Sequence, residues 1–496
     1  MLFNSIHFMT FFPIVVFIYF VIPGTFKKIW LLAASYYFYM SWNPKYAILI
    51  ITSTVLTYGS GLFIEKYKDK ERKCCQHINK YILVVCLISN LSILAIFKYG
   101  NFFIDSFNRI LKQFHISTIQ QRFDFLLPVG ISFYTFQALG YIIDVYRGDI
   151  KAEKNLLQYA LFISFFPQLV AGPIERSKNL LSQLKDTFEF DVDNAKNGLL
   201  TMAYGLFMKI AVADNISVVI DPIFDSPDDH SGMILLFATI MFAFQIYCDF
   251  NGYTQIAIGS AKVLGFGLSQ NFESPYMGCS VKDFWRRWHI SLTSWFRDYL
   301  YIPLGGGKKG KFRKQINTMI IFLCSGLWHG AGWHFIVWGA LNGLFSVFED
   351  IMKPIKGKID NHLSIDKEKW MYKVFQRIIT FTLIDFTWLF FRAPSLTTAL
   401  HMLKKIVNDF RLAWLINFNF VSAFESAHIL MTVMIPLFII AALDVIKYYG
   451  KDIKATIFSQ QIVFRWTIYA AIMLAILYWG LYGTGYEQTQ FIYFQF

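Results

Sequence analysis

Charged residues are scarce in this chain. Asp, Glu, Lys and Arg make up 16% of its 496 residues, compared with about 25% in an average soluble domain. Hydrophobic residues, in contrast, make up 55% of the chain and aromatic residues 19%. So few charges cannot cover the apolar surface of a soluble protein of this size. The composition therefore excludes the soluble globular and disordered classes and predicts a polytopic membrane protein.

Signatures of metal sites, disulfide scaffolds and common hydrolases are also missing. The six cysteines are scattered without a CxxC pair, and Cys74, Cys75 and His77 lack a fourth metal ligand. The chain has no HExxH and no GxSxG motif. Residues 305–311 imitate a phosphate-binding loop, but Phe312 follows where Ser or Thr is required. We therefore expect no metal ion and no bound cofactor.

Basic residues outnumber acidic ones, with 46 Lys and Arg against 33 Asp and Glu and a net charge of +13. They gather in short clusters between apolar segments, at 27–28, 66–80 and 308–314. Cytoplasmic loops of membrane proteins collect Lys and Arg in this way, so the charge predicts loop topology and no nucleic-acid partner. The first apolar run precedes Lys27 and lacks the basic start of a signal peptide, which predicts an uncleaved first span.

Apolar segments recur along the whole chain and predict an all-α polytopic membrane protein. A helical span needs about 20 mainly apolar residues, and with several shorter segments we expect about 11 crossings. Segments 30–42 and 157–171 are too short to cross upright, which leaves tilted, re-entrant and half-spanning arrangements open. Segment 249–310 is amphipathic and predicted to lie at the interface or fold back into the bundle. We expect a single domain, 1–496, with its core motifs at about 125–345. The candidate spans are 8–22, 29–42, 46–64, 81–97, 125–143, 157–171, 199–220, 233–248, 316–338, 374–391, 428–446 and 464–482.

Two histidines stand in tryptophan-rich surroundings, His289 within 285–292 and His329 within the apolar run 319–338. An ionisable side chain inside such a run is costly and marks a functional site by default. Gly326 and Gly330 form a small-residue face that allows close approach of another helix or a ligand. On one continuous helix, His329 and Trp333 would share a face, as in a narrow apolar tunnel.

A neutral imidazole is suited to take a proton from a hydroxyl near neutral pH, as acyl transfer to an alcohol requires. No Ser or Cys is evidently coupled to either histidine, which favours direct transfer over an acyl-enzyme. On periodicity alone, an interhelical hydrogen-bonding role is the favoured interpretation of His329, and a structural role at the interface is favoured more strongly for His289, next to Arg286 and Arg287.

At these motifs the sequence resembles the membrane-bound O-acyltransferase family, in the bacterial branch that contains the alginate O-acetylation membrane protein. The similarity runs almost from end to end. It departs slightly at Asn251, where Ser is more usual, which leaves the acceptor open. The matching motifs are LPVGISFYTFQ at 127–137, DVYR at 144–147, FPQLVAGPI at 166–174, DFNGY at 249–253, FWRRWHISL at 284–292, YIPLGG at 301–306, WHG at 328–330, FFRA at 390–393 and FIYF at 491–494.

The resemblance implies a membrane-bound O-acyltransferase fold with re-entrant segments around a central tunnel. It implies His329 and His289 as the catalytic residues, with His329 as base or proton shuttle and His289 positioning the acyl carbonyl or sharing that role. Residues proposed to line the tunnel or bind substrate are Trp285, Trp288, Trp328, Trp333, Asp249 and Asn251.

The same resemblance implies the reaction partners. The donor would be an acyl thioester on the cytoplasmic side, acetyl-CoA first among them. The acceptor would be a cell-envelope polysaccharide, alginate-like or peptidoglycan, served by an SGNH-type acetyltransferase outside the bacterial cytoplasmic membrane. Two alternatives stay open, an acyl-group conduit for a separate extracellular transferase and D-alanyl transfer to teichoic acid.

Overall fold

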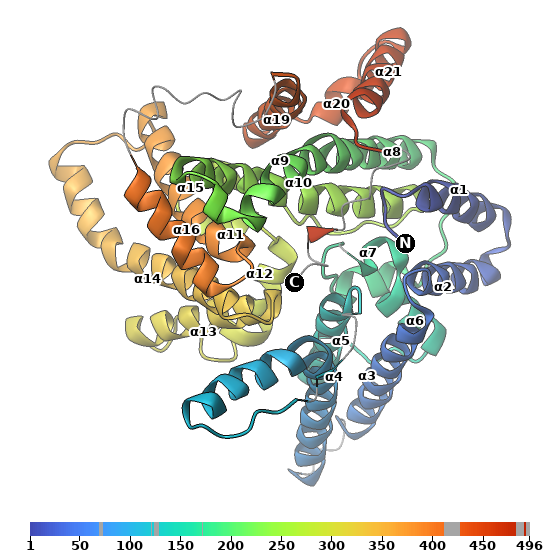
Figure 1. Ribbon diagram of the computed structural model, residues 1–496. Helices are drawn as coiled ribbons and strands as arrows, with labels where there is room; N and C mark the ends of the chain where they lie inside the picture. The colour runs from blue at the N-terminus through green and yellow to red at the C-terminus, as the bar shows by residue number, and fades with distance from the viewer. Residues whose placement is uncertain are drawn as a thin grey trace. The chain divides into compact units, whose positions relative to one another are not determined.

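A computed structural model describes residues 1–68, 73–120, 122–123, 128–170, 172–410, 427–482 and 491–492 (Figure 1). Regular structure in these ranges is helical, without a strand. The all-α class predicted from the sequence is confirmed. Several residues of the motifs and segments above lie outside the described residues, namely 69–72, 125–127, Ala171, Tyr493 and Phe494, as does the side chain of Cys74.

Eight helical stretches of the described chain are long and apolar enough to cross a membrane, judged by length and composition. Predicted crossings outside this set, such as 29–42 and 157–171, form shorter helices. A further apolar helix, α1 (Ile6–Val21), has 16 residues. The eight are Pro44–Tyr67, Cys75–Gln113, Val192–Asp225, Gly232–Val263, Trp333–His362, Trp370–Arg392, Ile429–Tyr448 and Ile462–Trp479.

The chain divides into two compact units, with boundaries inside the helices α8 and α10 and after Ser269. The first unit comprises Met1–Met202 and Thr254–Ser269, and the second comprises Ala203–Tyr253 and Gln270–Phe496. The single domain predicted from the sequence stays a prediction. Helices that begin in the first unit are α1, α2 (Gly24–Met40), η1 (Pro44–Tyr46), α3 (Ala47–Lys68), α4 (Lys73–Gln113), α5 (Ile131–Arg147), α6 (Leu156–Ser164), α7 (Phe166–Leu169), η2 (Ser177–Leu181) and α8 (Val192–Leu206).

The predicted re-entrant segment 157–171 is a broken helix in the first unit. Helix α6 ends at Ser164, Phe165 leaves the helical conformation at ψ 109°, and α7 follows. The Phe166 N–H freed by the break donates to Ser35 Oγ at 3.1 Å. Gln137 and Gln168 amides donate to the Phe162 carbonyl at 2.6 and 3.0 Å. Irregular backbone at membrane depth is tolerated when protein groups satisfy it in this way.

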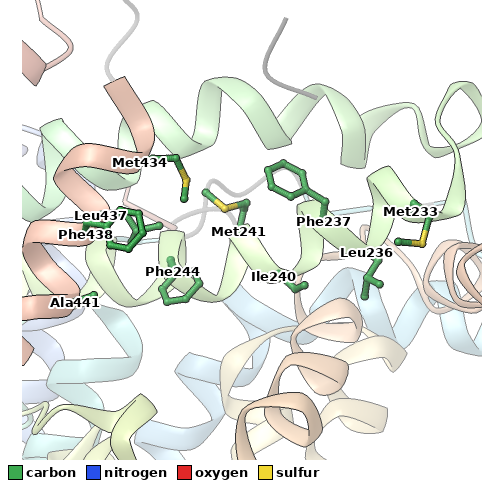
Figure 2. A pocket seen from close by; sticks show the side chains of 10 residues that line it. All are labelled: Met233, Leu236, Phe237, Ile240, Met241, Phe244, Met434, Leu437, Phe438 and Ala441. Atoms are coloured by element: carbon green, nitrogen blue, oxygen red, sulfur yellow. The ribbon is translucent and has the colours of Figure 1, made fainter. Parts of the chain in front are cut away.

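The remaining helices begin in the second unit, and among them α13 and α14 lie side by side (Figure 1). An apolar cavity of about 390 Å³ lies between α10 and α19, with Met241 and Phe438 among its lining (Figure 2). The helices are η3 (Phe207–Ala213), α9 (Asp214–Asp225), η4 (Pro227–Asp229), α10 (Gly232–Val263), η5 (Pro275–Met277), α11 (Val281–Arg287), α12 (Ile290–Phe296), η6 (Arg297–Tyr301), α13 (Lys311–His329), α14 (Trp333–His362), α15 (Trp370–Arg392), α16 (Leu396–Asp409), α19 (Ala427–Tyr448), α20 (Ile453–Phe458) and α21 (Ile462–Trp479).

Two predictions about local structure are wrong. The predicted span 316–338 is not one helix, because α13 ends at His329 and α14 begins at Trp333. The extended conformations of Gly330 and Gly332 interrupt it, so His329 and Trp333 do not share a helical face. The predicted amphipathic segment also begins too early, since Asp249 and its neighbours to Val263 continue the long helix α10. Short helices start only after that point.

Of the predicted small-residue face, Gly326 lies on α13 and packs against α14, whereas Gly330 lies beyond the end of the helix. A Cβ added at Gly326 would lie 2.3 Å from the Phe335 carbonyl oxygen, and one added at Gly339 would lie 2.3 Å from the Phe322 carbonyl oxygen. Because the two backbones lie so near each other, neither position has room for a side chain. The two glycines therefore fix α13 against α14 and, with it, the position of His329 at the end of α13.

Candidate active site

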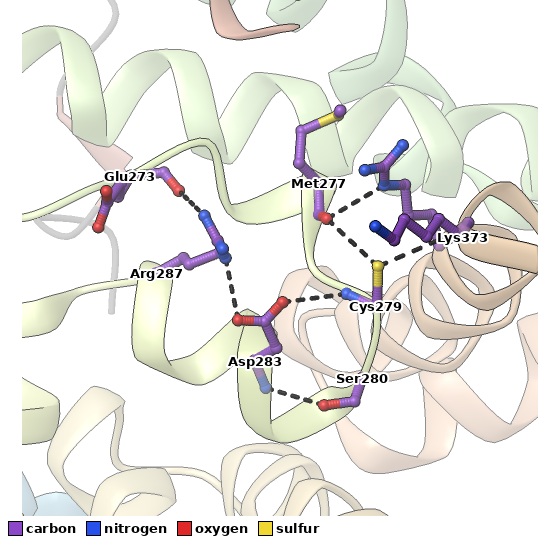
Figure 3. A network of polar contacts seen from close by, with 8 residues as sticks. Glu273, Met277, Cys279, Ser280, Asp283, Arg287 and Lys373 are labelled. Atoms are coloured by element: carbon purple, nitrogen blue, oxygen red, sulfur yellow. Dashed lines mark hydrogen bonds and ion pairs between the residues drawn. The ribbon is translucent and has the colours of Figure 1, made fainter. Parts of the chain in front are cut away.

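The short helix α11 is held at both ends by a polar network (Figure 3). Ser280 Oγ accepts from the Asp283 N–H at 3.1 Å, and Asp283 accepts from the Cys279 N–H at 3.1 Å. This reciprocal capping satisfies donors that the start of a helix leaves open. Arg287 Nε binds Asp283 at 3.0 Å, and its Nη1 donates to the Glu273 carbonyl at 3.3 Å. The network fixes the turn that leads to His289.

His289 occupies a strained backbone position between α11 and α12. Its φ and ψ are 44° and 54°, in the left-handed region, which costs a non-glycine residue about 1–3 kcal/mol. Asn271 stabilises this turn, because its carbonyl accepts from the Ile290 N–H at 2.9 Å and its Oδ1 from the Ser291 N–H at 3.2 Å. Strain that the surroundings sustain in this way is typical of functional sites.

The contacts of Asn271 determine the tautomer of the His289 ring. Oδ1 of Asn271 accepts from a backbone N–H of Ser291 and also from the Ser291 hydroxyl at 2.9 Å, so the atom in this place must be oxygen. His289 Nδ1 lies 3.1 Å from the same oxygen and must therefore donate. Nε2 is then the acceptor nitrogen of the neutral ring. His289 lies outside the eight candidate spans, and burial lowers its pKa to about 3, so the ring is neutral at physiological pH.

His329 is the last residue of α13 and is buried. Its ring meets Trp328 and Trp338 edge-on, at centroid distances of 4.9 Å each, and Phe391 of α15 at 5.3 Å. The carbonyl groups of the last helical turn carry partial negative charge. They stabilise the positive charge that an imidazole acquires when it takes a proton.

The two histidines belong to one aromatic cluster and share Trp328 as a neighbour. The centroid of the His289 ring lies 5.8 Å from that of Trp328, which lies 4.9 Å from that of His329. On its other side His289 meets Phe250 of α10 edge-on at 4.7 Å. Helices α10, α12 and α13 thus bring together residues that are far apart in the sequence, and the sequence-predicted pair His289 and His329 lies in one site.

Of the other predicted site residues, Trp285, Trp288 and Trp328 are buried in this cluster. Trp285 packs against Trp338 at 5.6 Å and donates to Asn342 Oδ1 at 3.2 Å, and Trp288 packs against Trp388 at 5.1 Å. Trp333 differs, because it starts α14 with 47% of its surface exposed. Trp338 takes the position against His329 that the sequence assigned to Trp333.

Asp249 and Asn251 make contacts of another kind. Asp249 forms an ion pair with Lys209 at 2.6 Å, and Lys209 also pairs with Asp214 at 2.8 Å, all three fully buried. Asp249 Oδ2 also accepts from the Ile492 N–H at 2.7 Å. Asn251 Nδ2 donates to the Tyr247 hydroxyl at 3.3 Å. These contacts join α10 to η3, α9 and the described end of the chain, which is a structural role. Substrate binding by either residue stays a prediction.

Sequence reasoning missed three residues of these sites. Lys209 had a usable signal, because it is a lone cation inside the apolar segment 199–220. Trp338 is one of several aromatics on its helix, and Asn271 is one polar residue of a loop. Nothing in the pattern singles out either of them. In the described chain, no group of three or more His, Cys, Asp or Glu side chains could hold a metal ion.

The fold and the site together define a helical membrane protein with two buried imidazoles in an aromatic cluster. Comparison with known proteins identifies the class more closely. Residues 152–391 match the model of the membrane-bound O-acyltransferase family, MBOAT. A peptidoglycan O-acetyltransferase of Helicobacter pylori is 34% identical to the chain, over 95% of this chain and 92% of its own length. The chain belongs to the membrane-bound O-acyltransferase family and is an O-acyltransferase.

Two further relatives differ in the acceptor that their names give. A protein of Pseudomonas aeruginosa named "probable alginate O-acetylase AlgI" is 36% identical over 80% of this chain and 73% of its own length. A teichoic acid D-alanyltransferase of Bacillus subtilis is 30% identical over 46% of this chain and 61% of its own length. The similarity to the two acetylating relatives therefore extends over far more of the chain.

Proposed function

We propose that the chain transfers or relays acetyl groups from a thioester donor across the membrane for O-acetylation of a cell-envelope polysaccharide. The relatives named for peptidoglycan and alginate acetylation, with similarity over 95% and 80% of this chain, support an acetyl group and a polysaccharide of one of these two kinds. We place the protein in the bacterial cytoplasmic membrane, with acetyl-CoA as donor on the cytoplasmic side. An SGNH-type acetyltransferase on the outer side would pass the group to the polymer.

The observation that carries this proposal is the tautomer of His289, whose ring shares the neighbour Trp328 with His329. A ring that donates from Nδ1 to Asn271 offers a lone pair at Nε2. Such a nitrogen accepts a hydroxyl proton, but it cannot donate a hydrogen bond to an acyl carbonyl. Of the two roles open from the sequence, we therefore assign His289 a share in proton transfer and leave carbonyl positioning aside.

The reaction follows from these two rings without a covalent intermediate on the protein. His329 takes the proton of the acceptor hydroxyl while its oxygen attacks the thioester carbonyl carbon. The carbon–sulfur bond then breaks, the ester forms, and the proton leaves with the thiolate as a thiol. The aromatic cluster around both rings excludes water, which would otherwise hydrolyse the thioester. His289 Nε2 accepts a hydrogen bond from the same hydroxyl or passes its proton to His329.

Substitution of the two histidines tests the proposal in cells. We expect His329→Ala to lower the rate of envelope acetylation by about 10²–10⁴-fold, the usual effect of removing a general base. The acetyl ester content of the envelope therefore falls, and His289→Ala should act in the same direction. His362→Ala is the matched control, because His362 is exposed at the end of α14. Protein abundance in the membrane is measured in each strain.

The outcome also separates the alternatives. Normal ester content in His329→Ala at equal abundance would contradict the proposal and favour a conduit that serves a separate transferase. Loss of ester-linked D-alanine, with acetyl ester unchanged, would point to D-alanyl transfer.

A further inference from the structure

The second unit contains a cavity of about 1020 Å³ between α11, α14 and α15, which the proposed reaction does not use. Neither His289 nor His329 lines it. Its lining combines apolar side chains of α14 and α15 with charged ones. The charged side chains are Lys282, Arg286, Glu349, Asp350, Lys353 and Lys356. Four cations thus face two carboxylates.

Protein partners already neutralise the carboxylate of Asp350. It forms ion pairs with Lys282 and, at 2.8 Å, with Lys314. Arg286 and Lys353 are exposed, and within the described ranges the side chain of neither forms a hydrogen bond or an ion pair. The cavity therefore carries surplus positive charge at Arg286 and Lys353, which attracts an anion.

The apolar part of the cavity lies on two candidate membrane spans. Leu344, Phe348 and Phe375 line it and are 53%, 61% and 60% exposed, and both α14 and α15 are candidate spans. Exposed apolar side chains on a span face lipid. Along α14, Leu344 precedes Lys356 by 12 residues, which corresponds to about 18 Å of helix. Along the helix, the lining thus changes from apolar to basic. An amphiphile with an apolar chain and an anionic head group matches these two parts.

The basic end of the cavity lies on the side that the charge pattern assigns to the cytoplasm. Lys314 of the basic cluster 308–314 reaches Asp350 in the lining, and such clusters mark cytoplasmic loops. The cytoplasmic leaflet carries anionic lipids, and basic pockets between spans bind their head groups.

We propose that this cavity binds an anionic phospholipid. Its phosphate lies between Arg286 and Lys353, with Lys356 close by, and an acyl chain follows Leu344 and Phe348 between α14 and α15. A guanidinium binds phosphate through two parallel hydrogen bonds, which favours Arg286 as the main ligand. The same helix carries Trp285, which packs on Trp338 beside His329. A bound lipid therefore stabilises α11, and this inference does not depend on the proposed function.

Thermal unfolding of the purified full chain in detergent tests the site. Phosphatidylglycerol is added, with phosphatidylcholine at the same concentration as the neutral lipid. We expect phosphatidylglycerol to raise the Tm of the wild type by several degrees and phosphatidylcholine to raise it by less than half as much. The double variant Arg286→Ala/Lys353→Ala loses this difference. Lys358→Ala keeps it, because Lys358 is an exposed lysine of the same helix outside the cavity.

Three results would overturn the proposal. Phosphatidylcholine could match phosphatidylglycerol, the double variant could respond as the wild type does, or coenzyme A could displace bound phosphatidylglycerol. The last result would assign the cavity to the phosphates of a thioester donor. If the double variant does not fold, Lys353→Gln is compared with Lys358→Gln by counting the lipids that each retains in native mass spectrometry. Equal retention contradicts the lipid site.

Discussion

The contacts of Asn271 give the sharpest prediction about the site. Asn271 is fully buried, and its Oδ1 accepts from the Ser291 N–H, the Ser291 hydroxyl and His289 Nδ1. Asn271→Ala removes the acceptor and leaves these donors buried without it. A donor left in this state costs about 1–3 kcal/mol. If that energy is lost from the alignment of the His289 ring, kcat falls by about 5- to 150-fold.

Asn271→Asp separates positioning from packing, because a carboxylate keeps the acceptor at the same place. In the wild type, burial lowers the pKa of His289 to about 3, so this ring stays a neutral base as the pH falls to 5. A carboxylate beside Nδ1 favours the protonated ring and raises its pKa. A base works only when deprotonated. Asn271→Asp should therefore be active at high pH and lose activity as the pH falls through the raised pKa.

The assay is acetyl transfer by purified protein between pH 5 and 9, with kcat and KM for the thioester determined separately. A positioning role lowers kcat in Asn271→Ala and adds an acid limb to the pH profile of Asn271→Asp. Unchanged kcat in Asn271→Ala at equal folded protein would refute the reasoning. So would a pH profile of Asn271→Asp that coincides with the wild-type profile.

Further predictions concern stability. Gly326→Ala should lower the free energy of unfolding by about 1–3 kcal/mol through overpacking, because its Cβ would lie 2.3 Å from the Phe335 carbonyl oxygen. Gly357→Ala on α14, with nothing within 4 Å of its Cβ, should be neutral or stabilising. Equal Tm shifts in Gly326→Ala and Gly357→Ala would contradict this prediction. Lys209→Met leaves two buried carboxylates unbalanced and should cost about 3–5 kcal/mol. Adding Asp249→Asn to Lys209→Met should restore part of the lost stability, measured as a rise in Tm. No recovery would show that the broken ion pair is not the cause of the loss.

The sequence singles out His329 because its signal is chemical, and its catalytic role stays a prediction. An imidazole in an apolar run is costly wherever it lies, so His329 stands out without any knowledge of the fold. The broken helix α6–α7 is predictable for a similar reason, since 157–171 is too short to cross upright. Such features need only local information.

What the sequence misses depends on contacts between distant segments. Lys209 balances Asp214, five residues on, and Asp249, forty residues on. The predicted span 233–248 stops one residue before Asp249. Asp249 therefore falls outside the predicted spans, and nothing in the sequence pairs it with Lys209. The break at Gly330 is hidden because apolar residues continue on both sides of it, and an apolar run alone does not show where one helix ends and another begins. Asn271 acquires its role only when the chain brings it to His289.

Transfer of labelled acetyl from acetyl-CoA to an acceptor hydroxyl by the purified full chain in liposomes tests the central claim most directly. Wild type, His289→Ala, His329→Ala and the control His362→Ala are compared at equal folded protein. The account predicts ester formation by the wild type and the control, and a loss of about 10²–10⁴-fold in both site variants. Ester formation by His329→Ala at the wild-type rate would contradict it.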